Sequence, residues 1–126
     1  MDPETYEKGR QVRTRVLGES YVAAAMQNRD DFSGPLQDLV TEYAWGAVWG
    51  RDGLALKTRS MLNLAMIAVL NRPHELRLHL RGALNNGVTR EEIREIFLQV
   101  GVYAGMPAAV DSFRIARELF AELDEA

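Results

Sequence analysis

His79 is the side chain in this sequence best suited to transfer a proton near neutral pH. At helical spacing it shares a face with Leu76, Leu80 and Ala83, so the imidazole should point inward and not to bulk water. A histidine can donate or accept a proton there if a substrate comes within hydrogen-bond reach. The alternative is a core histidine whose hydrogen bonds are satisfied by its neighbours. The spacing alone leaves both interpretations open.

Glu42, Trp45 and Trp49 form a second candidate group. Their spacings of three and four place them on one face if the helix continues far enough, with a carboxylate beside two large apolar rings. A glutamate in that position could act as an acid or a base. The alternative is a solvated glutamate next to two tryptophans of the core.

Two arginines and one tyrosine could bind an anionic substrate. Arg51 and Arg59 flank a glycine-containing turn, and a guanidinium can hold a carboxylate through two parallel hydrogen bonds. Arg59 is the better candidate of the two, and the alternative is that both are surface or interface residues paired with acids. Tyr103 is expected at a helix end, where its hydroxyl could reach a pocket or the ring could belong to the core.

The elements that must position these residues are all predicted to be helices. Apolar residues recur at intervals of three and four and do not alternate, which indicates an all-α fold of about six to seven helices in one domain, residues 1–126. Proline, glycine and capping signals give starts and ends for these helices. We expect helices over Pro3 to Leu17, Tyr21 to Asn28, Leu36 to the glycines at 46–53, Leu56 to Leu70, Pro73 to Asn86, Thr89 to Gly105, and from Pro107 to Leu123.

Several packing relations follow from the same patterns. The segment after Leu36 should be a first core helix with a buried apolar stripe, and the helix over residues 56–70 is apolar on nearly every face, as expected of a central helix or one covered by a partner. Thr89 and Glu92 form a capping box, and the helices on either side of Gly87 should form a hairpin. The last helix could also contribute to a subunit interface. The stripe after Leu36 comprises Leu36, Leu39, Val40, Tyr43 and Ala47.

Charge and composition narrow the classes of partner. The net charge is -3, but residues 51–81 hold six basic and two acidic side chains, which favours a small anion over nucleic acid. The chain has no cysteine and only two histidines, so a thiol nucleophile is excluded and an internal metal site is not expected. No apolar run is long enough to cross a bilayer, and the polar start, MDPETYEKGR, predicts a cytoplasmic location.

The stretch LRLHLRGALNNGVTREEIREIFLQVGVYAG, with WGAVWGRDGLALKTRSMLNLA before it and MPAAVDSFRIA after it, closely resembles the carboxymuconolactone decarboxylase family. The likeness runs from about Leu36 to Ala116. It implies a helical bundle of the alkyl hydroperoxidase D-like type that assembles into a homo-oligomeric ring, commonly a hexamer. Peroxidase members of the wider superfamily carry a Cys-x-x-Cys pair where this chain has Arg72 and Glu75, so thiol peroxidase activity is excluded.

The resemblance implies a reaction without a cofactor: 4-carboxymuconolactone would lose CO2 to give the enol-lactone of 3-oxoadipate, in the protocatechuate branch of the β-ketoadipate pathway. It favours catalytic roles for His79 and Glu42, with the division of roles between them open. Arg59, aided by Arg51, would hold the anionic lactone, and Trp45 and Trp49 would form an apolar wall. The alternatives are an enzyme acting on another small lactone or keto acid, and a non-catalytic helical oligomer that binds a small anion or a protein.

Overall fold

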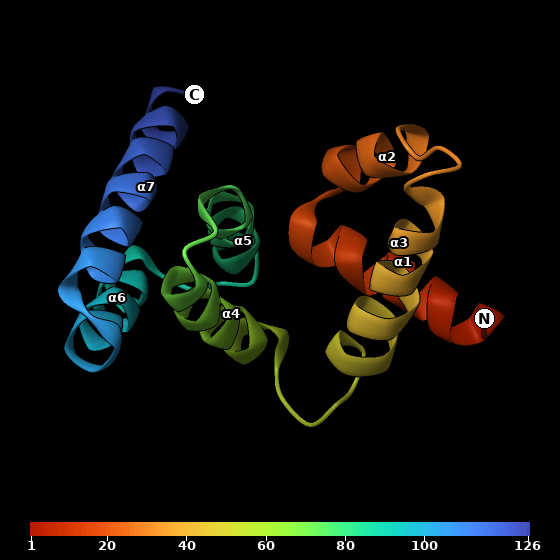
Figure 1. Ribbon diagram of the computed structural model, residues 1–126, viewed down its shortest axis with the longest axis horizontal. Coiled ribbons are helices and arrows are strands. Elements are labelled where there is room, and N and C mark those ends of the chain that lie inside the picture. The colour runs from red at the N-terminus through yellow and green to blue at the C-terminus, as the bar shows by residue number, and fades with distance from the viewer. The chain divides into compact units, whose positions relative to one another are not determined.

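The computed structural model describes residues 1–126 and consists of seven α-helices, one π-helix and no strand (Figure 1). The predicted all-α fold class is therefore confirmed. The helices form two compact units, Met1–Leu56 and Lys57–Ala126, and each unit is described by itself. The prediction of a single domain over residues 1–126 stays a prediction.

The first unit contains α1 (Pro3–Leu17), α2 (Glu19–Gln27), α3 (Gly34–Leu39) and the π-helix η1 (Val40–Trp49). Local signals fix these limits. Asp2 caps α1 by accepting a hydrogen bond from the Glu4 backbone N–H at 3.2 Å, and Pro3 occupies the first helical position. Gly18 ends the helix with φ +97°, a conformation that glycine adopts at little cost. The predicted limits of α1 are confirmed.

The main packing contact of the first unit is a close crossing of α1 and η1. Gly9 of α1 lies against the backbone of Thr41 and Gly46, and Gly46 of η1 lies against the backbone of Thr5. A Cβ atom at Gly9 would come within 2.7 Å of the Gly46 backbone nitrogen, which is closer than real Cβ atoms approach. The two backbones can therefore pack at this distance only because neither position carries a side chain.

The helix after Leu36 differs from the prediction in its type. It starts as α3 and continues without interruption as η1, in which the backbone hydrogen bonds skip one more residue than in an α-helix. At the transition, the Thr41 hydroxyl donates a 2.7 Å hydrogen bond to the Gln37 carbonyl, an interaction that competes with the regular backbone ladder. This change of pitch is not visible in a sequence pattern read at 3.6 residues per turn.

The prediction that the apolar stripe on this helix is buried is also wrong for the first unit. Leu36 and Leu39 are each 60% exposed and Tyr43 is 66% exposed. The helix instead turns Thr41 and Gly46 toward the interior, because its close backbone approach to α1 occurs on that side. The stripe is thus an exposed apolar face within the first unit.

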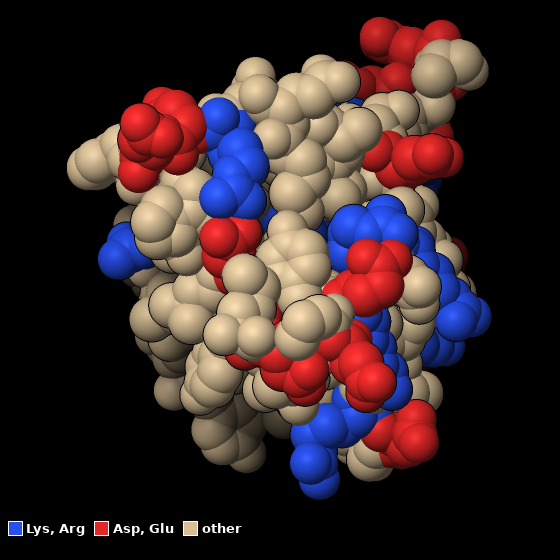
Figure 2. Space-filling model, turned by 90° about the vertical axis from the view of Figure 1, so that its right-hand side faces the viewer, with Lys and Arg blue, Asp and Glu red and all other residues tan.

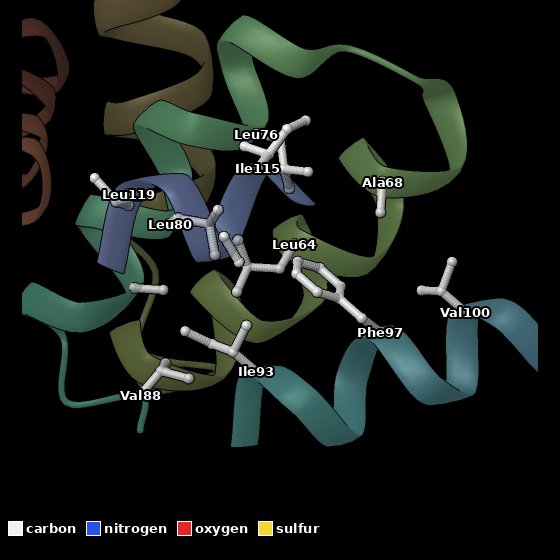
Figure 3. Close-up of a cluster of buried hydrophobic side chains, with 12 residues drawn as sticks. Leu64, Ala68, Leu76, Leu80, Val88, Ile93, Phe97, Val100, Ile115 and Leu119 are labelled. Atoms are coloured by element: carbon white, nitrogen blue, oxygen red, sulfur yellow. The ribbon is translucent and has the colours of Figure 1, made fainter. Parts of the chain in front are cut away.

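The second unit contains α4 (Leu56–Leu70), α5 (Pro73–Asn85), α6 (Arg90–Ala104) and α7 (Met106–Glu125). All four helices contribute to one hydrophobic cluster, and Figure 3 shows Leu64, Leu80 and Phe97 pointing into it. Phe97 is fully buried and meets Phe113 edge to face, with ring centroids 5.9 Å apart. The remaining labelled members are Ala68, Leu76, Val88, Ile93, Val100, Ile115 and Leu119.

The connections in the second unit confirm most of the expected stop and start signals. Gly87 has φ +89° after α5, and Gly105 has φ +116° between α6 and α7. The capping box is complete, since the Glu92 backbone N–H donates to the Thr89 hydroxyl at 3.1 Å and the Thr89 N–H donates to the Glu92 carboxylate at 2.9 Å.

One packing expectation for the second unit is wrong, and another stays a prediction. The close helix neighbour of α6 is α7, so α5 and α6 do not form the expected tight hairpin. On α4, Ser60, Leu64 and Ala68 are buried whereas Leu62 and Met66 are about half exposed. The expectation that this helix is covered on nearly every face, by other helices or by a partner, therefore stays a prediction. The apolar composition of α4 therefore exceeds what its own unit buries.

Charged side chains of both signs are interspersed on the face drawn in Figure 2, with apolar and uncharged groups between them. Many of the ion pairs are local or exposed, such as Arg10 with Glu7 and Arg29 with Asp38. Pairs of this kind contribute little to stability. None of the helices is long and apolar enough to span a membrane.

Candidate active site

His79 lies on α5 with its ring partly enclosed by the second unit. Its helix neighbours Leu76, Leu80 and Ala83 are buried, as predicted, and the imidazole itself is half-buried. Burial lowers the pKa of the His79 imidazole from its ordinary value of 6.5, because a charged ring loses hydration there, and the negative charge of Glu75 partly opposes this effect. The ring is therefore held in its neutral form near pH 7.

The His79 ring makes a polar contact with a side chain of α4. The side-chain nitrogen Nδ2 of Asn63 lies 3.5 Å from Nδ1 of His79, and nearby the Asn86 amide donates a 2.8 Å hydrogen bond to the Ser60 hydroxyl. These two contacts connect α4 to the α5 region through polar side chains. Asn63 was not among the residues predicted from the sequence, although its place as the one polar residue in the apolar run over residues 61–70 was a usable signal.

Arg59 lies one helical turn before Asn63, so the two side chains start from the same face of α4. Arg59 is half-buried, and its Nε atom is buried without a hydrogen-bond partner. A buried donor left unpaired is energetically costly, and a carboxylate is the acceptor that best matches a guanidinium. This face of α4 and the facing side of α5 therefore carry an arginine, an amide and an imidazole suited to an anionic ligand.

The tryptophans of η1 form a stacked pair in the first unit. Their ring centroids are 4.6 Å apart with an interplanar angle of 28°, and Trp45 and Trp49 are only 4% and 8% exposed. Glu42 is half-buried, but a π-helix has more residues per turn than an α-helix, so a spacing of three no longer places it in line with Trp45. The expectation that Glu42 shares the face of both rings is therefore wrong. Arg51 follows η1 and is exposed.

Tyr103 is not a core residue, since 84% of it is exposed. It lines an open, mostly apolar groove of about 790 Å³ between α4 and α6, together with Met61, Ala65 and Ile96. Neither Arg59 nor His79 lines this groove, and α5, the helix of His79, contributes no residue to it. Tyr103 therefore belongs to a different surface from the polar face that contains His79.

The structure thus brings some of the predicted residues into one unit and leaves others apart. Arg59 and His79 belong to the second unit, and Asn63 joins them there. Two further arginines lie on α5: Arg81 is exposed, and Arg77 forms an ion pair with Glu122 of α7. The predicted residues of the first unit are Glu42, Trp45, Trp49 and Arg51.

A comparison with protein families adds a decisive observation. The model described as the carboxymuconolactone decarboxylase family matches residues 34–118, about two thirds of the chain. The chain belongs to this family. The match includes η1 and the helices that carry Arg59, Asn63 and His79, so the candidate site lies within the part of the chain that defines the carboxymuconolactone decarboxylase family.

Three proteins similar to this chain are named as decarboxylases. The chain is 43% identical over 122 residues to a 4-carboxymuconolactone decarboxylase of Acinetobacter baylyi, covering 97% of this chain and 91% of that protein. It is 45% identical over 113 residues to the nitrosuccinic acid decarboxylase npaB of Metarhizium robertsii, covering 90% and 79%. A 4-carboxymuconolactone decarboxylase of Pseudomonas putida is 36% identical over 45 residues, which cover 36% of this chain and 94% of that protein.

Proposed function

We propose that this protein decarboxylates 4-carboxymuconolactone to the enol-lactone of 3-oxoadipate and CO2, without a cofactor, in the protocatechuate branch of the β-ketoadipate pathway. The observation that carries the choice of substrate is the 43% identity to the Acinetobacter baylyi enzyme across 97% of this chain. The polar face with Arg59 and His79 supports it, because the substrate is a small anion. A cytoplasmic location remains a prediction from the sequence.

The chemistry of the substrate explains why no cofactor is required. The departing carboxylate is attached to a ring carbon that is conjugated through a double bond to the lactone carbonyl. When the bond between this carbon and the carboxylate breaks, CO2 leaves and the electron pair spreads onto the carbonyl oxygen of the lactone, which gives a dienolate. A proton then adds to the ring carbon next to the carbonyl. The protein must bind the anion, exclude water and stabilise the oxyanion.

Arg59 is the proposed anion anchor, assisted by Arg51. The unpaired, buried Nε of Arg59 could donate to a carboxylate oxygen together with one of the terminal nitrogens. We assign this contact to the side-chain carboxylate that stays on the product. A cation at the departing carboxylate would instead stabilise the ground state and raise the barrier to its loss.

His79 and Glu42 are the proposed groups for oxyanion stabilisation and proton transfer. The His79 ring is neutral near pH 7, so one of its nitrogens carries a hydrogen and can donate a hydrogen bond. Glu42 is half-buried and is the proposed proton carrier. The stacked Trp45 and Trp49 supply an apolar surface on the same helix as Glu42, where they would limit access of water.

Turnover by the purified protein in the presence of a metal chelator tests this proposal. CO2 release and formation of the enol-lactone from 4-carboxymuconolactone should both occur. His79→Ala and Glu42→Gln should each lower kcat by more than about tenfold with an unchanged circular dichroism spectrum, because positioned acids contribute about 10²–10⁴-fold. His74→Ala, at an exposed histidine of the same helix, is the matched control and should leave the rate unchanged. Near-normal rates for both site variants would refute the assignment.

Decarboxylation of nitrosuccinic acid is the second candidate, because the identity to the Metarhizium robertsii enzyme is 45% over 90% of this chain. In that acid a carboxylate shares its carbon with a nitro group, so the electron pair left by CO2 can move onto the nitro oxygens as a nitronate. A second carboxylate remains for Arg59 to hold. Comparison of kcat/KM for the two acids decides between them, and a higher value for nitrosuccinate would replace the first proposal.

We also propose self-association into a homo-oligomer, with a hexamer as the expected state. Large apolar side chains are exposed in each unit, including Leu36, Leu39 and Tyr43 in the first and Met66 and Val69 in the second. Contiguous exposed apolar surface is typical of interaction sites. Sedimentation at the mass of one 14.2 kDa chain at micromolar concentration would refute self-association.

A further inference from the structure

Asn63 and His79 face each other through specific atoms. Nδ2 of the Asn63 amide lies 3.5 Å from Nδ1 of the imidazole, and both side chains are half-buried. An amide nitrogen carries hydrogens and can only donate, whereas a neutral imidazole has one donor nitrogen and one acceptor nitrogen. With this orientation of the amide, Nδ1 is the acceptor and the proton of the ring is on Nε2.

The position of Asn63 in the helix calls for a polar partner. Residues 61–70 of α4 are otherwise apolar, and Leu64 and Ala68 on the neighbouring face are buried in the hydrophobic cluster. A half-buried amide in such a helix loses hydration, and it is retained at lower cost when it has a polar partner. The imidazole of His79 is the partner that the structure provides.

We infer that Asn63 is a positioning residue that holds His79 in the tautomer with the proton on Nε2, so that His79 acts as a neutral hydrogen-bond donor to the oxyanion of the substrate. This inference rests on the proposed decarboxylation. It divides the roles left open between the two candidate groups: His79 stabilises the dienolate oxygen, and the proton that reaches carbon comes from another group, for which Glu42 is the candidate. The partner of one ring nitrogen sets the role of the other, as in other enzymes that use histidine.

Nitrogen NMR of the imidazole tests the tautomer directly and does not depend on activity. The chain has two histidines, so His74→Gln leaves His79 as the only imidazole signal in protein labelled with ¹⁵N-histidine. The spectra are recorded at pH 7.5, which is about one unit above the ordinary pKa of histidine. We expect the ¹⁵N chemical shift of an unprotonated nitrogen for Nδ1 and that of a protonated nitrogen for Nε2.

Two variants and one control determine whether Asn63 sets this state. Asn63→Asp places a group that only accepts next to Nδ1, so the Nδ1 shift should move to the protonated range. Asn63→Leu removes the donor at similar size, and both shifts should move toward an average of the two tautomers. Ser60→Ala removes the neighbouring hydrogen bond to Asn86 and should leave the ring shifts unchanged. Wild-type shifts retained in Asn63→Leu and Asn63→Asp would overturn the inference.

Kinetics with 4-carboxymuconolactone then connect the tautomer to the reaction. Asn63→Asp should lower kcat by at least about tenfold while KM changes by less than about threefold, because the lost contact is made to the oxyanion and not to the ground state. Unchanged kcat in a variant whose Nδ1 has become protonated would overturn the positioning role. Absence of turnover by the wild-type protein, with the expected NMR shifts, would instead refute the proposed decarboxylation and leave the tautomer assignment standing.

Discussion

Replacing Gly9 with alanine should destabilise the first unit, although alanine favours helices by about 1 kcal/mol over glycine. The new Cβ would lie 2.7 Å from the Gly46 backbone nitrogen and closer still to the Thr41 carbonyl oxygen. Side-chain rotation cannot relieve these contacts, because both partners are backbone atoms. Overpacking costs typically about 1–3 kcal/mol, and a rigid contact belongs at or above the upper end. The net loss of stability should be about 2 kcal/mol.

The two tryptophans provide a local probe of this effect. Both belong to η1, so tryptophan fluorescence reports on the helix that α1 contacts, whereas circular dichroism reports on all helices. The fluorescence-detected Tm of Gly9→Ala should fall by roughly 6–10 °C. Gly53→Ala is the control, since a Cβ there would meet nothing within 4 Å. An unchanged or higher Tm for Gly9→Ala would show that α1 and η1 do not pack closely at these glycines.

Two further predictions concern the second unit. Thr89→Ala removes the hydroxyl that accepts from the Glu92 backbone N–H and should lower the free energy of unfolding by about 1 kcal/mol in urea titrations; an unchanged midpoint would contradict the role of the capping box. Because of His79, the free energy of unfolding should fall as the pH drops below about 6.5. The pKa of His79 is lower in the folded chain than in the unfolded chain, so between these two pKa values the unfolded chain binds the proton more readily. Above this pH range the contribution of His79 to the free energy of unfolding is constant. Between pH 7 and pH 5 the free energy of unfolding of His79→Gln should fall less steeply than that of the wild type; parallel curves of this free energy against pH would contradict the lowered pKa.

Helix limits were predictable where short-range chemistry determines them. The limits expected for α1 and α4 coincide with those observed, because each helix has a local stop or start signal: Asp2 and Pro3 before α1, Gly18 after it, and the Asn71 to Pro73 segment after α4. Such signals depend on residues within one or two turns, so they can be read from the chain without knowledge of its packing.

The type of η1 and the exposure of its apolar stripe could not be predicted in the same way. Both depend on contact with α1, where Gly9 and Gly46 allow the backbones to approach and thereby select the buried face of the helix. Because periodicity analysis assumes an α-helix and assigns the most apolar face to the core, it placed Leu36 and Tyr43 inside. The interaction that decides the buried face links residues more than thirty positions apart.

For the candidate site, the sequence indicated which side chains have useful chemistry but not which atoms meet. The inward position of His79 was predictable, because its neighbours at helical spacing are apolar. Its contact with Asn63 was not, since the two residues are 16 positions apart on different helices. Tyr103 was placed correctly at a helix end, yet its exposure depends on the space left between α4 and α6.

The polar residues of α4 now separate by whether their hydrogen bonds are satisfied. Ser60 accepts from Asn86, and Asn63 meets His79, so these two side chains have partners within the unit. Arg59 differs, because its buried Nε has none. A helix built only for packing would gain stability from apolar residues at such positions. The unmet donor of Arg59, one turn from the Asn63–His79 contact, is therefore the place on α4 where a carboxylate would relieve a cost that the folded chain otherwise bears.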